Sequence, residues 1–147
     1  MKVIDHATLS FPSRSANEGF ARTAAACFAA RLDPTLEELA DIKTAVSEAV
    51  TNAIVHAYPD RIGKITLRLR LLEGGRLEIQ VKDAGIGIAD VEKAREPLFT
   101  TGSEDRSGMG FTIMESFMDQ LRVRSAPGKG TTVTMCKRIA PRPGAGR

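Results

Sequence analysis

A glutamate and an asparagine stand four residues apart in an otherwise apolar stretch, at Glu48 and Asn52. On a helix this spacing places the carboxylate and the amide on one face, one turn apart. The carboxylate could then act as a general base and the amide oxygen as a Mg²⁺ ligand. Asparagine is a poor helix former, so its position inside a helix asks for a reason. Surface or capping roles are the simpler alternative for both residues.

Two glycine-rich segments follow this pair along the chain. Asp83 comes after an alternating segment and precedes Gly85 and Gly87. A carboxylate here can accept a hydrogen bond from the exocyclic amine of adenine, and the glycines let the backbone pass close to the ring. A turn at the end of a strand explains the same residues as well. Gly108 and Gly110 begin a predicted helix, where backbone amides can bind phosphate, although glycine is also common at ordinary loop-to-helix junctions.

The chain must supply elements that position these groups, and its first third predicts one strand and two helices. A weak alternation predicts an edge strand over residues 6–12. Ser13 or Ser15 can cap a helix that runs to about Arg31. The predicted inward stripe of this helix contains Phe20, Ala24 and Phe28.

Thr35 and Glu38 have the spacing of a capping box and predict the start of the second helix. This helix should run over residues 36–57, because Tyr58-Pro59 ends it. Its predicted inward residues follow a helical repeat: Leu39, Ile42, Val46, Val50 and Ile54.

The rest of the chain predicts two hairpins and two helices. Residues 65–71 and 77–81 alternate with period two around a glycine turn, and residues 121–124 and 131–135 form a second such pair. Short helices are predicted over 90–95 and 110–118, with a loop over 97–108. The order of elements favours an α+β two-layer sandwich, in which helices cover one face of a mixed, mostly antiparallel sheet. We expect one domain over residues 1–140 and a disordered basic tail over 141–147.

Composition excludes several classes of protein. The net charge of +3 comes from the last eleven residues, since the preceding 136 carry 17 basic and 18 acidic side chains. With one tyrosine, no tryptophan and no concentrated basic face, we expect no direct nucleic-acid binding. No apolar run is long enough to span a membrane, and the first residues lack a signal peptide, so a cytoplasmic protein is expected. Cys27 and Cys136 are predicted to be reduced, buried thiols.

Glu48 and Asn52, the two glycine segments and the Thr-rich loop between those segments together resemble the ATP-binding domains of the GHKL superfamily. The resemblance covers residues 36 to 136. Three longer segments are similar to the sporulation anti-sigma-F factors, which are small serine-protein kinases of Gram-positive spore formers. These segments cover residues 47–58, 97–101 and 106–115.

The resemblance implies a role for each matched residue. Glu48 would be the general base for a substrate serine, Asn52 the Mg²⁺ ligand, and Asp83 the adenine-binding carboxylate. The remaining nucleotide-binding positions would be Gly85, Gly87, Thr100, Thr101, Gly102, Arg106, Gly108, Gly110 and Thr131. Arg22 would contact protein partners. The resemblance also implies ATP, ADP and Mg²⁺ as ligands, a sigma factor and an anti-anti-sigma protein as partners, and a homodimer. The first strand, around residues 7–11, is a candidate for the dimer interface by edge pairing.

Other functions compete with this kinase hypothesis. An ATP-gated binding module would need Asn52, Asp83 and the glycines but not Glu48. An ATPase clamp of the gyrase kind is disfavoured, because only a tail is expected after residue 140. A histidine kinase is disfavoured because His6 lies in a predicted strand and no separate phosphoacceptor helix is predicted.

Overall fold

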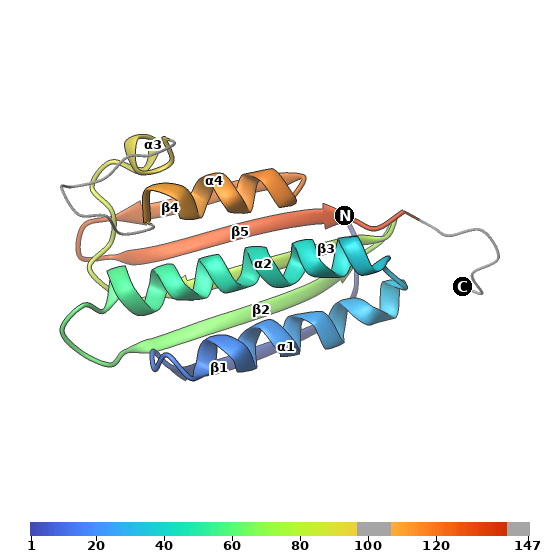
Figure 1. Cartoon of the computed structure of the whole chain (residues 1–147), viewed down its shortest axis with the longest axis horizontal. Coiled ribbons are helices and arrows are strands. Elements are labelled where there is room, and N and C mark those ends of the chain that lie inside the picture. Colours follow the sequence, from blue (N-terminus) through green and yellow to red (C-terminus); the bar gives the residue numbers. More distant parts are fainter. Residues whose placement is uncertain (97–106, 141–147) are drawn as a thin grey trace.

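The computed structural model describes residues 1–96 and 107–140, and it shows one antiparallel sheet covered on one face by helices (Figure 1). The strands are β1 (Val3–Pro12), β2 (Lys64–Leu72), β3 (Arg76–Asp83), β4 (Gln120–Ala126) and β5 (Gly130–Arg138). Their order is β1-β2-β3-β5-β4, and every neighbouring pair is antiparallel. The predicted α+β sandwich is confirmed, and the sheet is antiparallel throughout rather than mixed. Both predicted hairpins form, β2 with β3 and β4 with β5. In the strand order of the sheet, β1 and β4 are the edge strands.

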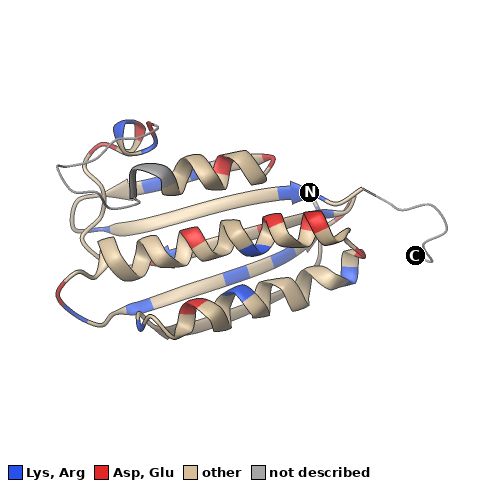
Figure 2. Ribbon diagram, in the orientation of Figure 1, with Lys and Arg blue, Asp and Glu red and all other residues tan. Residues whose placement is uncertain are grey.

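The helices lie side by side over the sheet in the order α1, α2, α4 (Figure 1). They are α1 (Asn17–Ala29), the 3₁₀ turn η1 (Ala30–Leu32), α2 (Leu36–Asn52), the π-helical turn η2 (Ala53–Ala57), α3 (Val91–Ala94) and α4 (Ser107–Phe117). Acidic and basic residues are interspersed on this helical layer (Figure 2). No helix among the described residues is long and apolar enough to cross a membrane.

The central helix α2 begins as the sequence predicts. Thr35 Oγ1 accepts a hydrogen bond from the Glu38 backbone at 3.0 Å, and the Thr35 backbone donates to the Glu38 carboxylate at 2.8 Å. This closed capping box satisfies two backbone N–H groups at the helix start. The other end departs from the prediction, because the last turn widens into η2. Single π turns inside helices occur frequently at functional sites.

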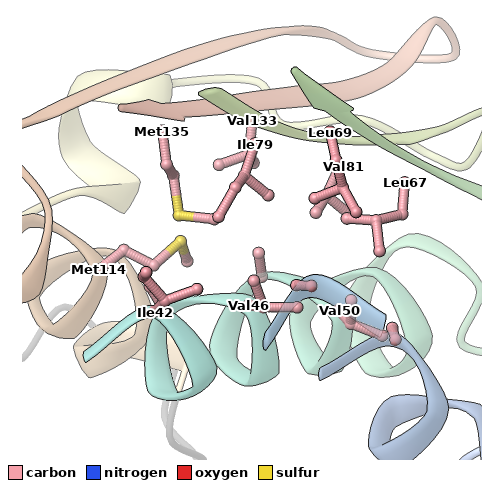
Figure 3. Packing of buried hydrophobic residues seen from close by; sticks show 14 of the residues in the cluster. Ile42, Val46, Val50, Leu67, Leu69, Ile79, Val81, Met114, Val133 and Met135 are labelled. Atoms are coloured by element: carbon pink, nitrogen blue, oxygen red, sulfur yellow. The ribbon is translucent and has the colours of Figure 1, made fainter. Parts of the chain in front are cut away.

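The core fills the space between α2 and the sheet (Figure 3). Ile42, Val46 and Val50 are fully buried on α2. They face side chains of the central strands: Leu67, Leu69, Ile79, Val81, Val133 and Met135. Met114 from α4 is also fully buried and closes the core beside Met135 (Figure 3). This packing fixes α2 against β3 and β5, the two strands that carry Asp83 and Thr131.

Two predictions for α1 are wrong. Its N-cap residue is Ala16, with no side-chain cap. Ser13 Oγ instead accepts a hydrogen bond from the Gly63 backbone at 2.9 Å, which ties the end of β1 to the start of β2. The buried stripe is Ala21, Ala25, Phe28 and Ala29, whereas Phe20 is 52 % exposed. Small alanines let α1 pack closely against its neighbours, so burial follows the alanines rather than the first phenylalanine.

The prediction of two buried cysteines is also wrong. Cys27 is exposed, and Cys136 is half-buried. Cys27 lies on α1 outside the alanine stripe. Cys136 lies next to Met135 on β5, and successive residues of a strand point to opposite faces of the sheet. Since Met135 points into the core, Cys136 points to the face that the helices leave uncovered.

Candidate nucleotide site

A cavity of about 200 Å³ lies where the end of α2 and η2 meet β3, β5 and α4. It brings together four of the predicted site residues, namely Asn52, Asp83, Gly87 and Thr131. The other residues that line it are mostly apolar: Ala49, Ala53, His56, Ala57, Val81, Ile88, Ala94, Phe111 and Val133. An apolar cavity with a few polar groups is suited to a flat ring system with polar edges.

Asp83 is the polar group at the strand end of this cavity, and its side chain is held by the backbone. It is the last residue of β3 and is 7 % exposed. Its Oδ1 accepts hydrogen bonds from the Gly85 backbone at 3.0 Å and from the Thr131 backbone at 3.1 Å. Within the described residues, Oδ2 receives no hydrogen bond. The carboxylate is therefore oriented through one oxygen and retains the other for a donor.

Burial raises the pKa of Asp83 above the ordinary value, and the hydrogen bonds from the Gly85 and Thr131 backbones lower it by less. Burial acts this way because the charged form loses hydration in the apolar cavity. A ligand that donates a hydrogen bond to Oδ2 would compensate part of that loss. The electrostatics thus favour a neutral or positive donor group beside Asp83.

The loop after Asp83 depends on a close backbone approach at Gly85. A Cβ placed on Gly85 would lie 2.2 Å from the carbonyl oxygen of Ala57. That same oxygen accepts a hydrogen bond from the Ile86 backbone at 3.1 Å. Gly85 is not among the described cavity-lining residues, so its glycine is required for packing of the loop against η2. Of the two glycines predicted to lie close to a nucleobase, Gly87 lines the cavity.

Tyr58 supports the same loop and was missed by the sequence analysis. Its hydroxyl accepts a hydrogen bond from the Ala84 backbone at 2.7 Å and donates one to the carbonyl oxygen of Lys64 at 2.7 Å. The ring is 4 % exposed. Tyr58 therefore links the end of α2 to the residue that follows Asp83. It is the only tyrosine of the chain, which was a signal the sequence offered.

Asn52 occupies the helix side of the cavity, against α4. A Cβ on Gly110 would lie 3.0 Å from Asn52 Nδ2 and 3.1 Å from Oδ1, so glycine at position 110 lets α4 approach the amide. Glu48 lies one turn earlier on α2 and is 8 % exposed, but it does not line the cavity as described. No group of three His, Cys, Asp or Glu side chains with metal-binding geometry occurs in the described residues. A Mg²⁺ ion held by one amide oxygen, phosphates and water would need none.

Some predicted residues lie elsewhere or outside the description. Thr100, Thr101, Gly102 and Arg106 are outside the described residues, and Gly108 lies in the first turn of α4. Arg22 is on α1, remote from the cavity lining. Its side chain is 43 % exposed, and its Nε lies 3.3 Å from the Glu18 carboxylate one turn earlier.

Comparisons with known proteins identify the class of protein to which this fold and this cavity belong. Residues 11–137 match the family model described as "Histidine kinase-like ATPase domain". Among solved structures, the RsbU and RsbW domains of a Mycobacterium tuberculosis protein superpose with a TM-score of 0.67 at 20% identity, covering 92% of this chain and 32% of that chain. A blue-light activated histidine kinase of Erythrobacter litoralis gives a TM-score of 0.60 at 26% identity, covering 84% and 41%. The chain therefore contains a histidine kinase-like ATPase domain of the GHKL class.

Proteins related in sequence identify a narrower family within this class. The chain is 62% identical over 132 residues to the anti-sigma F factor of Caldanaerobacter subterraneus subsp. tengcongensis, covering 89% of this chain and 92% of that protein. It is 55% identical over 133 residues to the anti-sigma F factor of Geobacillus kaustophilus, and 54% identical over 133 residues to that of Clostridium acetobutylicum. In both cases about nine-tenths of each chain is covered: 90% and 91%, and 90% and 92%, respectively. The chain belongs to the anti-sigma F factor family.

Proposed function

We propose that this chain is an ATP-dependent serine-protein kinase that phosphorylates an anti-anti-sigma protein and also binds and inhibits a sporulation sigma factor. The observation that carries the proposal is the cavity that unites Asp83, Thr131 and Asn52. The relatives named as anti-sigma F factors support the choice of partners.

The cavity would hold the adenine of ATP or ADP. The 6-amino group would donate to Asp83 Oδ2, the carboxylate oxygen that receives no hydrogen bond among the described residues. Val81, Ile88 and Val133 would enclose the ring on apolar surface. The α4 start, with Gly108 and Gly110, would face the phosphates, and Thr100, Thr101, Gly102 and Arg106 would be further nucleotide-binding residues. The base would then be fixed at the strand end and the phosphates near α2.

Phosphoryl transfer would take place on the α2 side of the site. Asn52 would hold Mg²⁺ through its amide oxygen, and the ion supplies neutralisation of phosphate charge when bound. Glu48 would accept the proton of the substrate serine while the serine oxygen forms a bond to the γ-phosphorus. The bond between the γ-phosphorus and the oxygen that bridges it to the β-phosphate would break at the same time, and ADP would leave. The burial of Glu48 limits the positions that its carboxylate can take, which favours such a directed role.

The substitution Glu48→Gln tests the base assignment. The amide keeps the size of the side chain but cannot accept the serine proton. We expect transfer of phosphate from ATP to an anti-anti-sigma protein to fall by about 100-fold or more, with ATP affinity changed by less than about 2-fold. The assay pairs phosphoserine detection with equilibrium nucleotide binding.

Glu37→Gln is the matched control, because Glu37 is exposed in the first turn of the same helix and should leave both quantities unchanged. Retained transfer in Glu48→Gln would refute the base role. Tight partner binding without phosphorylation by the unaltered protein would favour the ATP-gated binding module. Failure to bind ATP at all would refute the whole proposal.

Partner choice is proposed to depend on the nucleotide, with Arg22 contacting both partners. The exposed side chain of Arg22 on α1 is accessible to a protein surface. A pull-down from a sporulating host should recover a sigma factor with ATP and the anti-anti-sigma protein with ADP. Arg22→Ala should weaken both captures while leaving ATP affinity intact, and unchanged capture would contradict this role.

A homodimer is proposed through β1. This strand pairs with β2 on one side only, which leaves the backbone groups of its other side available for pairing. Small-angle scattering at micromolar concentration should give twice the mass of the chain. A strict monomer under those conditions would exclude the dimer.

A further inference from the structure

The hydroxyl of Ser125 stands behind the polar end of the cavity and makes three short contacts. Ser125 lies on β4 directly opposite Thr131 of β5. Its Oγ lies 2.8 Å from the Ile88 backbone nitrogen, 2.8 Å from the Gly130 carbonyl oxygen and 2.8 Å from Thr131 Oγ1. Ser125 itself does not line the cavity as described.

Counting protons fixes the direction of all three hydrogen bonds. The Ile88 nitrogen can only donate, and the Gly130 carbonyl oxygen can only accept. Ser125 has one hydroxyl proton, and the contact with Gly130 requires it. The contact between the two hydroxyls must therefore use the proton of Thr131. Every contact is satisfied only if Thr131 donates to Ser125.

This assignment removes the only proton that the Thr131 side chain could offer to a ligand. Its oxygen then presents lone pairs alone to a ligand or a bridging water. Beside it, Asp83 also presents an acceptor, because its Oδ1 is already engaged by two backbone N–H groups. The polar end of the cavity thus consists of acceptors, and a ligand acceptor placed there would meet repulsion and lose its own hydrogen bond.

We propose that Ser125 is a positioning residue for base specificity: by holding Thr131 as an acceptor, it makes the cavity select a 6-amino edge, as in adenine, over a 6-oxo edge, as in guanine. The inference rests on the proposed function, since it assumes that the cavity binds the base of a nucleotide. Ser125 would act through Thr131 and Ile88, without contacting the base itself.

The variants Ser125→Thr and Ser125→Val form a matched pair, because they have the same shape and differ in the hydroxyl group. Both are β-branched and suit a strand position. The dissociation constants of ATP and GTP are measured for each by competition against a fluorescent nucleotide, with thermal unfolding as the check of folding. Ser125→Thr should keep the preference for ATP over GTP. In Ser125→Val the Thr131 hydroxyl no longer donates to Ser125, so it can donate a hydrogen bond to a 6-oxo group. The preference for ATP over GTP should therefore fall by about 3- to 10-fold.

The ratio of the two affinities separates specificity from stability. If Ser125 only supports the fold, Ser125→Val weakens both nucleotides by the same factor, and the unchanged ratio overturns the inference. Thr134→Val is the control, because it removes a hydroxyl from β5 that accepts a hydrogen bond from Gln80 at 3.3 Å, and Thr134 is not among the residues that line the cavity, so the ratio should be unchanged. If Ser125→Val does not fold, a loss of preference in Ser125→Ala supports the inference and a retained preference overturns it. If the unaltered protein binds neither nucleotide, the proposed function itself fails.

Discussion

Replacing Asp83 by asparagine changes one atom group at the polar end of the cavity. The amide oxygen of asparagine can take over both hydrogen bonds that Oδ1 now accepts, from the Gly85 and Thr131 backbones. The second oxygen becomes an NH₂ group, which faces the cavity as a donor. The loop geometry should therefore survive, while the preferred partner at that edge changes from a donor to an acceptor.

The expected loss of affinity follows from that single exchange. A hydrogen bond to a charged group contributes about 1.5–3 kcal/mol, which corresponds to a loss of about 10- to 150-fold in ATP affinity. Two donors also face one another in the variant, which places the result toward the upper end. GTP should lose less than ATP, because its 6-oxo group can accept from the new amide. The apo protein should not lose stability, because the substitution removes a charge that burial disfavours.

Isothermal titration with ATP and GTP, together with urea unfolding of the apo protein, measures these quantities. Asp119→Asn is the control, because Asp119 Oδ2 accepts a hydrogen bond from the Arg138 backbone at 2.7 Å away from the cavity. An ATP affinity within about 2-fold of the unaltered protein would refute the assignment of Asp83 to the base. A large fall in unfolding free energy would refute the argument that the amide oxygen keeps the loop bonds.

The raised pKa of Asp83 adds a pH dependence to the same experiment. Because burial places this pKa above 3.8, lowering the pH should protonate Asp83 and weaken ATP binding before an ordinary aspartate would titrate. The Asp83→Asn variant should lack this step. For folding, a raised pKa means that the contribution of Asp83 is full at low pH and is lost as pH rises through the folded-state pKa. The stability of the variant relative to the unaltered protein should therefore increase with pH.

Two further substitutions test the supports of the site. Gly110→Ala places a methyl group 3.0 Å from Asn52 Nδ2, so it should weaken Mg²⁺-ATP binding by about 10-fold and ATP binding without Mg²⁺ by less. Gly19→Ala, whose methyl group would meet nothing closer than 3.4 Å, is its control, and equal losses with and without Mg²⁺ would contradict a metal role for Asn52. Tyr58→Phe removes the hydroxyl that holds the Ala84 backbone, which should cost about 1–3 kcal/mol in urea unfolding and also weaken ATP binding. An unchanged unfolding free energy would show that the loop after β3 does not depend on that bond.

Local patterns predicted most of the elements, because such patterns report interactions between near neighbours in sequence. The capping box at Thr35 and Glu38 formed as expected, since both partners lie within one helical turn. The hairpins also formed, because glycine turns join strands of matching alternation. The inward stripe of α1 was wrong at Phe20, because burial there depends on how closely α1 packs against other elements. The π turn η2 was not predicted, because it too depends on tertiary contacts.

The sequence predicted which residues belong to the candidate site better than it predicted which of them lie in contact. Asn52, Asp83, Gly87 and Thr131 do meet at one cavity. Glu48 is buried on the same helix outside the described lining, and Gly85 serves the packing of the loop. Ser125 was missed, although the turn at residues 127–130 and the hairpin register place it opposite Thr131. Residue spacing could have suggested that pairing, but it could not supply the direction of the hydrogen bonds.

The sequence by itself determined the class of this protein, because the order of Glu48, Asn52 and the two glycine segments is a property of the chain alone. The tertiary structure decided which atoms are available for chemistry. Asp83 retains Oδ2 because two backbone groups occupy Oδ1. Thr131 offers only lone pairs because, in the proposed arrangement, its hydroxyl donates a hydrogen bond to Ser125. The hydrogen bonds of Asp83 join β3 to β5, which are far apart in the chain, and they bring Asp83 to the hairpin that pairs Ser125 with Thr131. They depend on strand order and register, which local periodicity does not encode.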